Sequence, residues 1–161
     1  MVGPGGAGKS TFARNLGERT GLPVVHLDEH YWQPGWVEPT RDDWRTTQEV
    51  LLGGDRWIAD GNYGGTFDSR FERADTVVVL QPPRLVCVRG ALGRQIRNHG
   101  RDVQAAGCPE HLDLAFLRWI WRYPVDSRRR LDDALARHPH LHVVELRSRR
   151  AATDFLGSVT G

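Results

Sequence analysis

The sequence predicts an α/β fold in three layers, with helices on both faces of a parallel sheet. Apolar runs of strand length alternate with amphipathic helical patterns along the whole chain, as they do in chains built from right-handed βαβ units. The run at residues 76–80 is apolar after its first residue, which is typical of a strand covered on both faces. A glycine-rich loop at residues 3–11 precedes the first helical pattern. Together these observations indicate a doubly wound sheet.

The glycine-rich loop has the spacing G-x-x-x-x-G-K-[ST] of a phosphate-binding loop. Its residues are Gly3, Pro4, Gly5, Gly6, Ala7, Gly8, Lys9, Ser10 and Thr11. Glycines allow successive backbone N–H groups to converge on an anion, and the helix that follows directs its positive end toward the same point. We expect Lys9, the only lysine in the chain, to contact the β- and γ-phosphates. Ser10 would place a hydroxyl on Mg²⁺, and Thr11 would donate to the α-phosphate or cap the helix. The predicted ligand is ATP with Mg²⁺.

Only Met1 and Val2 precede Gly3, whereas a phosphate loop normally follows a buried strand of about five residues. A parallel sheet that lacks its middle strand leaves backbone groups unpaired on the neighbouring strands. The sequence therefore predicts a truncated first strand and a short sheet centre. Either the start was assigned too late or the loop begins the protein. We favour the first explanation and expect the full-length protein to start earlier.

The length and charge of the chain bound the remaining possibilities. Its 161 residues fit one domain, and its net charge of +2 comes from interspersed charges that do not predict a general polyanion-binding surface. Cys87 and Cys108 are too few for a disulfide framework, and no apolar run approaches the ~18 residues of a membrane span. We therefore expect one domain over residues 1–161, a cytoplasmic location and no membrane partner.

The first half of the chain gives the order helix 10–20, strand 24–27, helix 40–52, strand 56–60 and helix 66–73. Gly21 ends the first helix, and Thr40 with Asp43 forms a capping-box-like start for the second. The strands lead into Asp28 and Asp60. A loop rich in Trp, Pro and Gly is expected at residues 30–39.

The second half gives the order strand 76–80, helix 82–98, helix 112–123, helix 124–138, strand 142–146 and helix 148–156. Pro82 suits a first helical turn, Pro124 predicts a division between two helices, and Ser148 suits an N-cap. Helical signals fail at residues 99–109. We expect a mobile segment there, within a lid-like segment around residues 99–125.

Asp28 and Asp60 are the candidate polar residues at the strand ends. The carboxyl ends of parallel strands meet at the edge where α/β sheets bind ligands. A carboxylate at this edge could orient an acceptor hydroxyl for phosphoryl transfer. The alternative is that each aspartate caps the turn that follows it.

Arginines are the candidate phosphate contacts outside the loop. Arg94, Arg97 and Arg101 lead into the segment at 99–109 and lack carboxylates four residues on, so we expect one of them to contact phosphate. The run at residues 128–130 is basic enough for nucleic acid, but the aspartates at 132–133 can pair with it along a helix. DNA is therefore possible as a partner but not indicated.

Tryptophans offer a second kind of candidate. Trp32 and Trp36 lie in the loop at 30–39 and suit an acceptor pocket, whereas Trp44 and Trp119 recur at the helical spacing of core residues. Packing alone explains the second pair. Only the first pair therefore points to a ligand.

With these residues placed, the chain resembles small P-loop kinases of the adenylate-kinase class. More narrowly it resembles the adenylate-kinase-related DNA topology modulation proteins (FlaR-like). The segments that carry the narrower resemblance are 26–28, 31–36, 60–63, 107–110 and 116–121. The resemblance implies a three-layer P-loop NTPase fold of the nucleoside and nucleotide kinase type.

The resemblance also implies roles for individual residues. Asp60 would organise the waters of Mg²⁺ or the acceptor, Asp28 would hold an acceptor hydroxyl, and Arg94 with Arg97 would neutralise the transferring phosphates. Arg147 follows the last strand, where adenine lies in relatives, and would contact the base.

The expected function is phosphoryl transfer from ATP–Mg²⁺ to a small-molecule or nucleotide acceptor. Residues 62–63 read Asn-Tyr where adenylate kinases continue Phe-Pro-Arg, and the chain lacks a full-length lid. Both departures put a nucleoside monophosphate acceptor in doubt. The alternative is a nucleotide-dependent regulatory switch or a DNA-topology-associated factor without small-molecule kinase activity.

Overall fold

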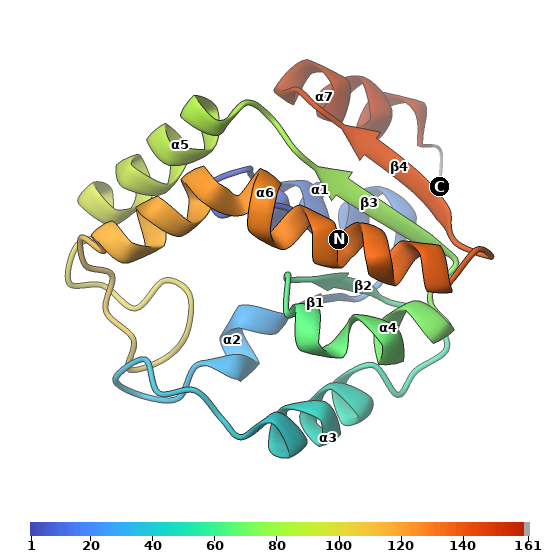
Figure 1. Ribbon diagram of the computed structural model, residues 1–161, viewed down its shortest axis with the longest axis horizontal. Helices are drawn as coiled ribbons and strands as arrows, with labels where there is room; N and C mark the ends of the chain where they lie inside the picture. The colour runs from blue at the N-terminus through green and yellow to red at the C-terminus, as the bar shows by residue number, and fades with distance from the viewer. Residues whose placement is uncertain (160–161) are drawn as a thin grey trace.

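The computed structural model describes residues 1–159 (Figure 1). Its elements, in chain order, are α1 (Lys9–Thr20), β1 (Val24–His26), α2 (Leu27–Tyr31), α3 (Arg41–Leu51), β2 (Ile58–Asp60), the 3₁₀ helix η1 (Gly64–Thr66), α4 (Phe67–Arg73), β3 (Thr76–Leu80), α5 (Arg84–Arg97), α6 (Leu114–Arg137), β4 (His142–Leu146) and α7 (Arg149–Ser158). The predicted α/β fold with parallel strands is confirmed.

The named strands form two parallel pairs, β1 with β2 and β3 with β4. In the first pair His26 lies opposite Asp60, and in the second Leu80 lies opposite Leu146. Parallel pairing places the carboxyl ends of all four strands on one edge, as binding sites in α/β sheets require. That edge carries the phosphate loop and both candidate aspartates.

Met1 and Val2 join the two pairs at the centre of the sheet. The Gly61 amide donates to the carbonyl of Met1 at 3.2 Å. On the other side, Val2 donates to the carbonyl of Val78 at 3.0 Å and accepts from the amide of Leu80 at 2.9 Å. The predicted short sheet centre beside the phosphate loop is thus observed, with Met1 and Val2 between the two pairs.

Side chains along β3 point alternately to the two faces of the sheet, and their contacts assign the helices to two layers. Val78 and Leu80 pack in one core cluster with side chains of α1 and α7, whereas Val77 and Val79 pack in another with side chains of α4 and the second half of α6. Successive side chains of a strand point to opposite faces, so these helices cover opposite sides of the sheet. Figure 1 shows this arrangement, with α6 in front and α1 behind.

The predicted division at Pro124 is wrong, because α6 continues through this residue. A proline inside a helix removes one backbone hydrogen bond and strains the preceding turn. The helix buries side chains on both sides of it, and this packing offsets the loss. The buried residues of α6 are Ile120, Tyr123, Leu131 and Ala134.

Two smaller predictions also differ from the structure. β1 ends at His26, and Asp28 lies in the first turn of α2 instead of directly at a strand end. Acidic residues favour helix N-termini, which accounts for the early turn at Asp28 and Glu29. β2 begins at Ile58, two residues later than predicted. Within residues 1–159, no helix has the length and apolar character needed to cross a membrane.

Candidate functional site

The backbone of the phosphate loop depends on glycine at three positions. Gly3 has φ 145°, and a Cβ there would lie 2.1 Å from the carbonyl oxygen of Leu80. Gly6 has φ 72°, and its Cβ would lie 2.0 Å from the carbonyl oxygen of Cys87. Gly8 has φ 92° and forms the N-cap of α1. Side chains at Gly3 and Gly6 would collide with backbone, so the loop can pack against β3 and α5 only with glycine there.

The loop leads directly into α1, whose first residue is Lys9. The Lys9 ammonium donates to the carbonyl of Pro4 at 3.1 Å and so folds back over the loop. The Gly3 amide donates to Asn62 Oδ1 at 2.9 Å, which ties the loop to the turn after β2. A mobile cation and a helix N-terminus therefore lie together, the pair that binds phosphate groups in such loops.

The loop opens onto a cavity of about 1160 Å³. The candidate residues that line it are Gly5, Gly6, Gly8, Lys9, Ser10, Thr11, Asp28, Trp32, Trp36, Asp60, Arg94 and Arg97. Gly3, Pro4 and Ala7 are buried and do not line it. The structure thus brings the phosphate loop, both aspartates and two of the arginines to one space.

Asp60 and His26 form a hydrogen-bonded pair on the cavity wall. His26 Nδ1 lies 3.0 Å from Asp60 Oδ2, and Asp60 is only 4% exposed. The bond to Asp60 raises the pKa of His26. Burial alone would raise the pKa of Asp60, but the bond from His26 and the positive charge of Lys9 outweigh it and the pKa is lowered. Asp60 Oδ1 is buried and has no hydrogen-bond partner among residues 1–159.

Asp28 is held by a tyrosine. The hydroxyl of Tyr63 donates to Asp28 Oδ1 at 2.5 Å, and burial raises the pKa of this phenol, followed by the charge of Asp28. The bond fixes one carboxylate oxygen and leaves Asp28 on the cavity wall. Asp28 thus has a fixed orientation toward the cavity that the loop shares.

Arg70 of α4 orders the turn that carries Tyr63. Its guanidinium donates to the carbonyl oxygens of Gly61 at 2.9 Å, Asn62 at 2.8 Å and Tyr63 at 3.1 Å. The side chain is buried, and burial lowers its pKa to about 10, so it stays charged at neutral pH. Sequence reasoning missed Arg70, because nothing in its helical spacing separates it from a surface arginine.

Arg94 and Arg97 both lie on α5 and line the cavity. Arg94 Nε forms an ion pair with Glu110 Oε1 at 3.0 Å, and Glu110 is 2% exposed. The sequence showed no partner for Arg94 four residues on; the partner comes from beyond the segment at 99–109. Sequence reasoning did not mark Glu110 as the partner of Arg94, or His26 as the partner of Asp60. Strand pairing places His26 opposite Asp60, so a signal existed for that pair.

Residues 99–113 carry neither helix nor named strand, and they contact the loop at 32–38. The Gly35 amide donates to the carbonyl of Gly107 at 2.8 Å, and Trp36 Nε1 donates to the carbonyl of Pro109 at 3.2 Å. Cys108 lies buried against Gln33, 3.1 Å from its carbonyl oxygen. The two irregular segments therefore meet beside the cavity, and the second half of the expected lid-like segment is the start of α6.

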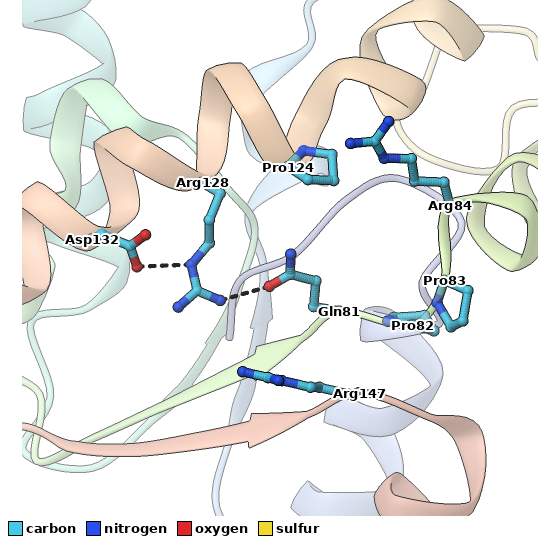
Figure 2. A pocket seen from close by; sticks show the side chains of 8 residues that line it. All are labelled: Gln81, Pro82, Pro83, Arg84, Pro124, Arg128, Asp132 and Arg147. Carbon is cyan, nitrogen blue, oxygen red and sulfur yellow. Dashed lines mark hydrogen bonds and ion pairs between the residues drawn. The ribbon is translucent and has the colours of Figure 1, made fainter.

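Arg147 lies outside this cavity, in a smaller pocket of about 500 Å³ (Figure 2). It pairs with Glu145 at 2.7 Å and is largely exposed. In the same pocket Arg128 pairs with Asp132 at 2.7 Å, as the helical spacing predicts. Arg149, the first residue of α7, lines the large cavity instead.

Comparison with known proteins supports the fold. No protein-family model matches the sequence, and no curated protein matches it. Among solved structures, the chain is similar to shikimate kinase from Acinetobacter baumannii in complex with shikimate, with a TM-score of 0.53 and 19% sequence identity. The alignment covers 97% of this chain and 86% of that one. At this identity the likeness shows the fold alone, an α/β fold like that of the shikimate kinase.

Proposed function

We propose that this chain binds ATP and Mg²⁺ and transfers the γ-phosphoryl group to a hydroxyl acceptor. The observation that carries the proposal is the shared cavity: the phosphate loop, Asp60 and the oriented carboxylate of Asp28 all line it. Phosphoryl transfer needs positioning and charge neutralisation more than covalent participation by the protein. The cavity offers carboxylates that can position an acceptor and cations that can neutralise phosphate charge.

The residues present fit a magnesium ion. Asp60 Oδ1 is buried without a partner among the described residues, which is costly unless a ligand or water fills the gap. Ser10 belongs to the first turn of α1 and lines the same cavity. In our proposal Ser10 and Asp60 would hold Mg²⁺, directly or through water. Bound there, the ion would neutralise triphosphate charge.

In the proposed reaction the acceptor oxygen forms a bond to the γ-phosphorus. The bond from that phosphorus to the β–γ bridging oxygen breaks, and ADP leaves with its electron pair. Asp28 accepts the hydroxyl proton, and its bond from Tyr63 keeps the carboxylate in position. Lys9, Arg94 and Arg97 contact the transferring phosphates. Residues 99–125 would act as a lid-like segment of a single domain.

ATP binding is tested by thermal unfolding with and without ATP–Mg²⁺. A ligand bound only by the folded state stabilises it by RT ln(1 + [L]/Kd), or about 2.7 kcal/mol at one hundred times Kd. We expect a rise in Tm that Lys9→Ala removes without loss of fold. No shift at millimolar nucleotide would refute the proposal. Arg147→Ala and Arg149→Ala form a matched pair. Because only Arg149 lines the large cavity, we expect Arg149→Ala to reduce the ATP-dependent rise in Tm more than Arg147→Ala does.

The narrower resemblance to the DNA topology modulation proteins remains our proposal for the family. A switch or DNA-associated role would show salt-dependent DNA binding that requires residues 128–130. Arg128 is engaged with Asp132, Gln81 and Glu145, which disfavours this alternative. Acceptor-dependent release of ADP separates the two candidates, because only a kinase produces it.

A further inference from the structure

Charge divides the cavity into two halves. Its lysine and arginine side chains all come from the loop, α1, α5 and α7; they are Lys9, Arg14, Arg94, Arg97 and Arg149. Residues 26–63, all of which the structure describes, add no lysine or arginine to the wall. They add carboxylates instead: Asp28, Glu29, Glu38 and Asp60. We name the half contributed by residues 26–63 the acceptor half.

Aromatic rings stand beside these carboxylates. Tyr31 and Trp32 meet edge to face, with centroids 4.9 Å apart and ring planes at 86°. Trp32 and Trp36 meet at 5.4 Å and 69°. All three line the cavity. The faces of aromatic rings attract cations. Glu38 lies close enough to Tyr31 to help burial raise the pKa of its phenol.

Buried polar atoms on the wall indicate that the cavity serves a polar ligand. Asp60 and Gln95 are 4% and 3% exposed, and Oδ1 of the first and Oε1 of the second lack partners among residues 1–159. On the other half of the wall, the charge of Arg94 is paired with Glu110. The acceptor half therefore adds no lysine or arginine with which to neutralise an anionic acceptor, and its one wall histidine, His26, is paired with Asp60.

We propose that the acceptor is an alcohol that carries an ammonium group. The inference rests on the proposed kinase function and deepens it. The hydroxyl lies at Asp28, and the cation lies against the rings of Tyr31, Trp32 and Trp36 with Glu38 as counter-ion. A nucleoside monophosphate brings negative charge to a wall of carboxylates, which disfavours it. The atoms balance as R–OH plus ATP giving R–O–PO₃²⁻, ADP and one proton.

The test is release of ADP in the presence of matched alcohols. The cationic probes are choline, ethanolamine and glucosamine; their neutral counterparts are 3,3-dimethylbutan-1-ol, propan-1-ol and glucose. We expect kcat/KM for at least one cationic probe to exceed that of its counterpart by about tenfold or more, the scale of a desolvated cation–π contact. A panel without cationic preference overturns the inference, as does preferential phosphorylation of AMP.

A variant pair locates the effect. Glu38→Gln removes the counter-ion and should lower the ratio of cationic to neutral turnover about fivefold or more, whereas Glu18→Gln, on the exposed side of α1, should not change it. An unchanged ratio in Glu38→Gln overturns the placement at Glu38. The thermal shift with ATP–Mg²⁺ is measured on the same samples. A shift without cationic preference refutes this inference alone, and absence of any shift refutes the kinase proposal with it.

Discussion

The phosphate loop and the acceptor half of the cavity are built in different ways. The loop is one continuous segment, residues 3–11, whose conformation follows from its own glycines and from the start of α1. The acceptor half combines the chain at 26–38 with the turn at 60–63, and the segment at 99–113 lies against it. Side chains hold these parts together. The loop is therefore one segment that packs closely against β3 and α5, whereas the acceptor half is assembled from separate segments.

This difference separates two kinds of sensitivity to mutation. In the loop the critical positions are those where backbone passes close to backbone, so an added methyl group does the damage. The acceptor half depends instead on buried donors behind it such as Arg70 of α4, which serves three carbonyl oxygens of the turn at 61–63. The two halves should therefore fail independently, and single substitutions can show this.

Gly6→Ala is expected to have the largest effect, and it acts on the loop. The new Cβ would lie 2.0 Å from the carbonyl oxygen of Cys87 at a φ of 72°. Left-handed backbone and overpacking together should cost about 2–5 kcal/mol of unfolding free energy. Urea denaturation measures the loss. Gly157→Ala, in α7 with open space around it, is the control and should stabilise the protein by up to about 1 kcal/mol.

Arg70→Lys tests the acceptor half without altering a cavity-lining side chain. An ammonium cannot reproduce the fork of donors that reaches three carbonyl oxygens. Carbonyls left without a donor should cost about 2–4 kcal/mol. ATP–Mg²⁺ should still raise the Tm of the variant from its lower starting value. Turnover of acceptors should fall, because Tyr63 and Asp28 lose their support. A stability loss under about 1 kcal/mol would contradict this role.

Most of the fold could be predicted from the sequence. The strands at 76–80 and 142–146 have the predicted bounds, because each is built around consecutive valines, which are β-branched and favour strands. The short pairing at the sheet centre followed from the two residues that stand before Gly3. The prediction that Pro124 divides two helices was wrong. The local cost of proline is visible in the sequence, whereas the burial that offsets it depends on contacts with β3 and α4.

The candidate site was predictable to different degrees in its two halves. Sequence spacing located Lys9 and Ser10, and strand ends located Asp60. The ion pair of Arg94 with Glu110 joins α5 to a segment without periodicity, so no local pattern could have indicated it. Arg147 was a reasonable candidate by position, but only the structure distinguishes its pocket from the cavity that Arg149 lines.

Glu110→Gln probes the contact between the phosphate side and the segment at 99–113. It removes the charge opposite Arg94 and weakens the bond from Gln104 Nε2, which is 3.0 Å from Glu110 Oε1. Because Glu110 is 2% exposed, we expect a loss of about 1–3 kcal/mol in urea denaturation. Asp126→Asn is the control: it breaks an exposed pair with Arg122 and should leave the unfolding free energy nearly unchanged. Equal losses in the two variants would contradict a structural role for the buried pair.

The smallest expected effect, about 1 kcal/mol, concerns His26→Gln and depends on pH. The pKa of His26 is raised by its bond to Asp60 and further by the charge of Glu29, against the opposing effects of burial and Arg14. A histidine with a raised pKa contributes fully to stability below the pKa it has in the unfolded state, about 6.5. The contribution disappears as the pH rises through the pKa it has in the folded state. Asp60, whose pKa is lowered, contributes to the stability of the folded state above about pH 4. That contribution is lost as the pH falls through the pKa of Asp60 in the folded state.

Both groups of that pair are charged between these limits. Wild type should therefore exceed His26→Gln in unfolding free energy most clearly near pH 5.5, and the difference should shrink by pH 9 as His26 loses its proton. Urea denaturation at the two pH values measures it. The bond joins neighbouring strands beside Lys9, so the result also shows whether the loop and the acceptor half are coupled. If they are independent, the ATP–Mg²⁺ shift of the variant at pH 9 should match that of wild type. A difference that grows toward pH 9 would contradict the assigned charge on His26.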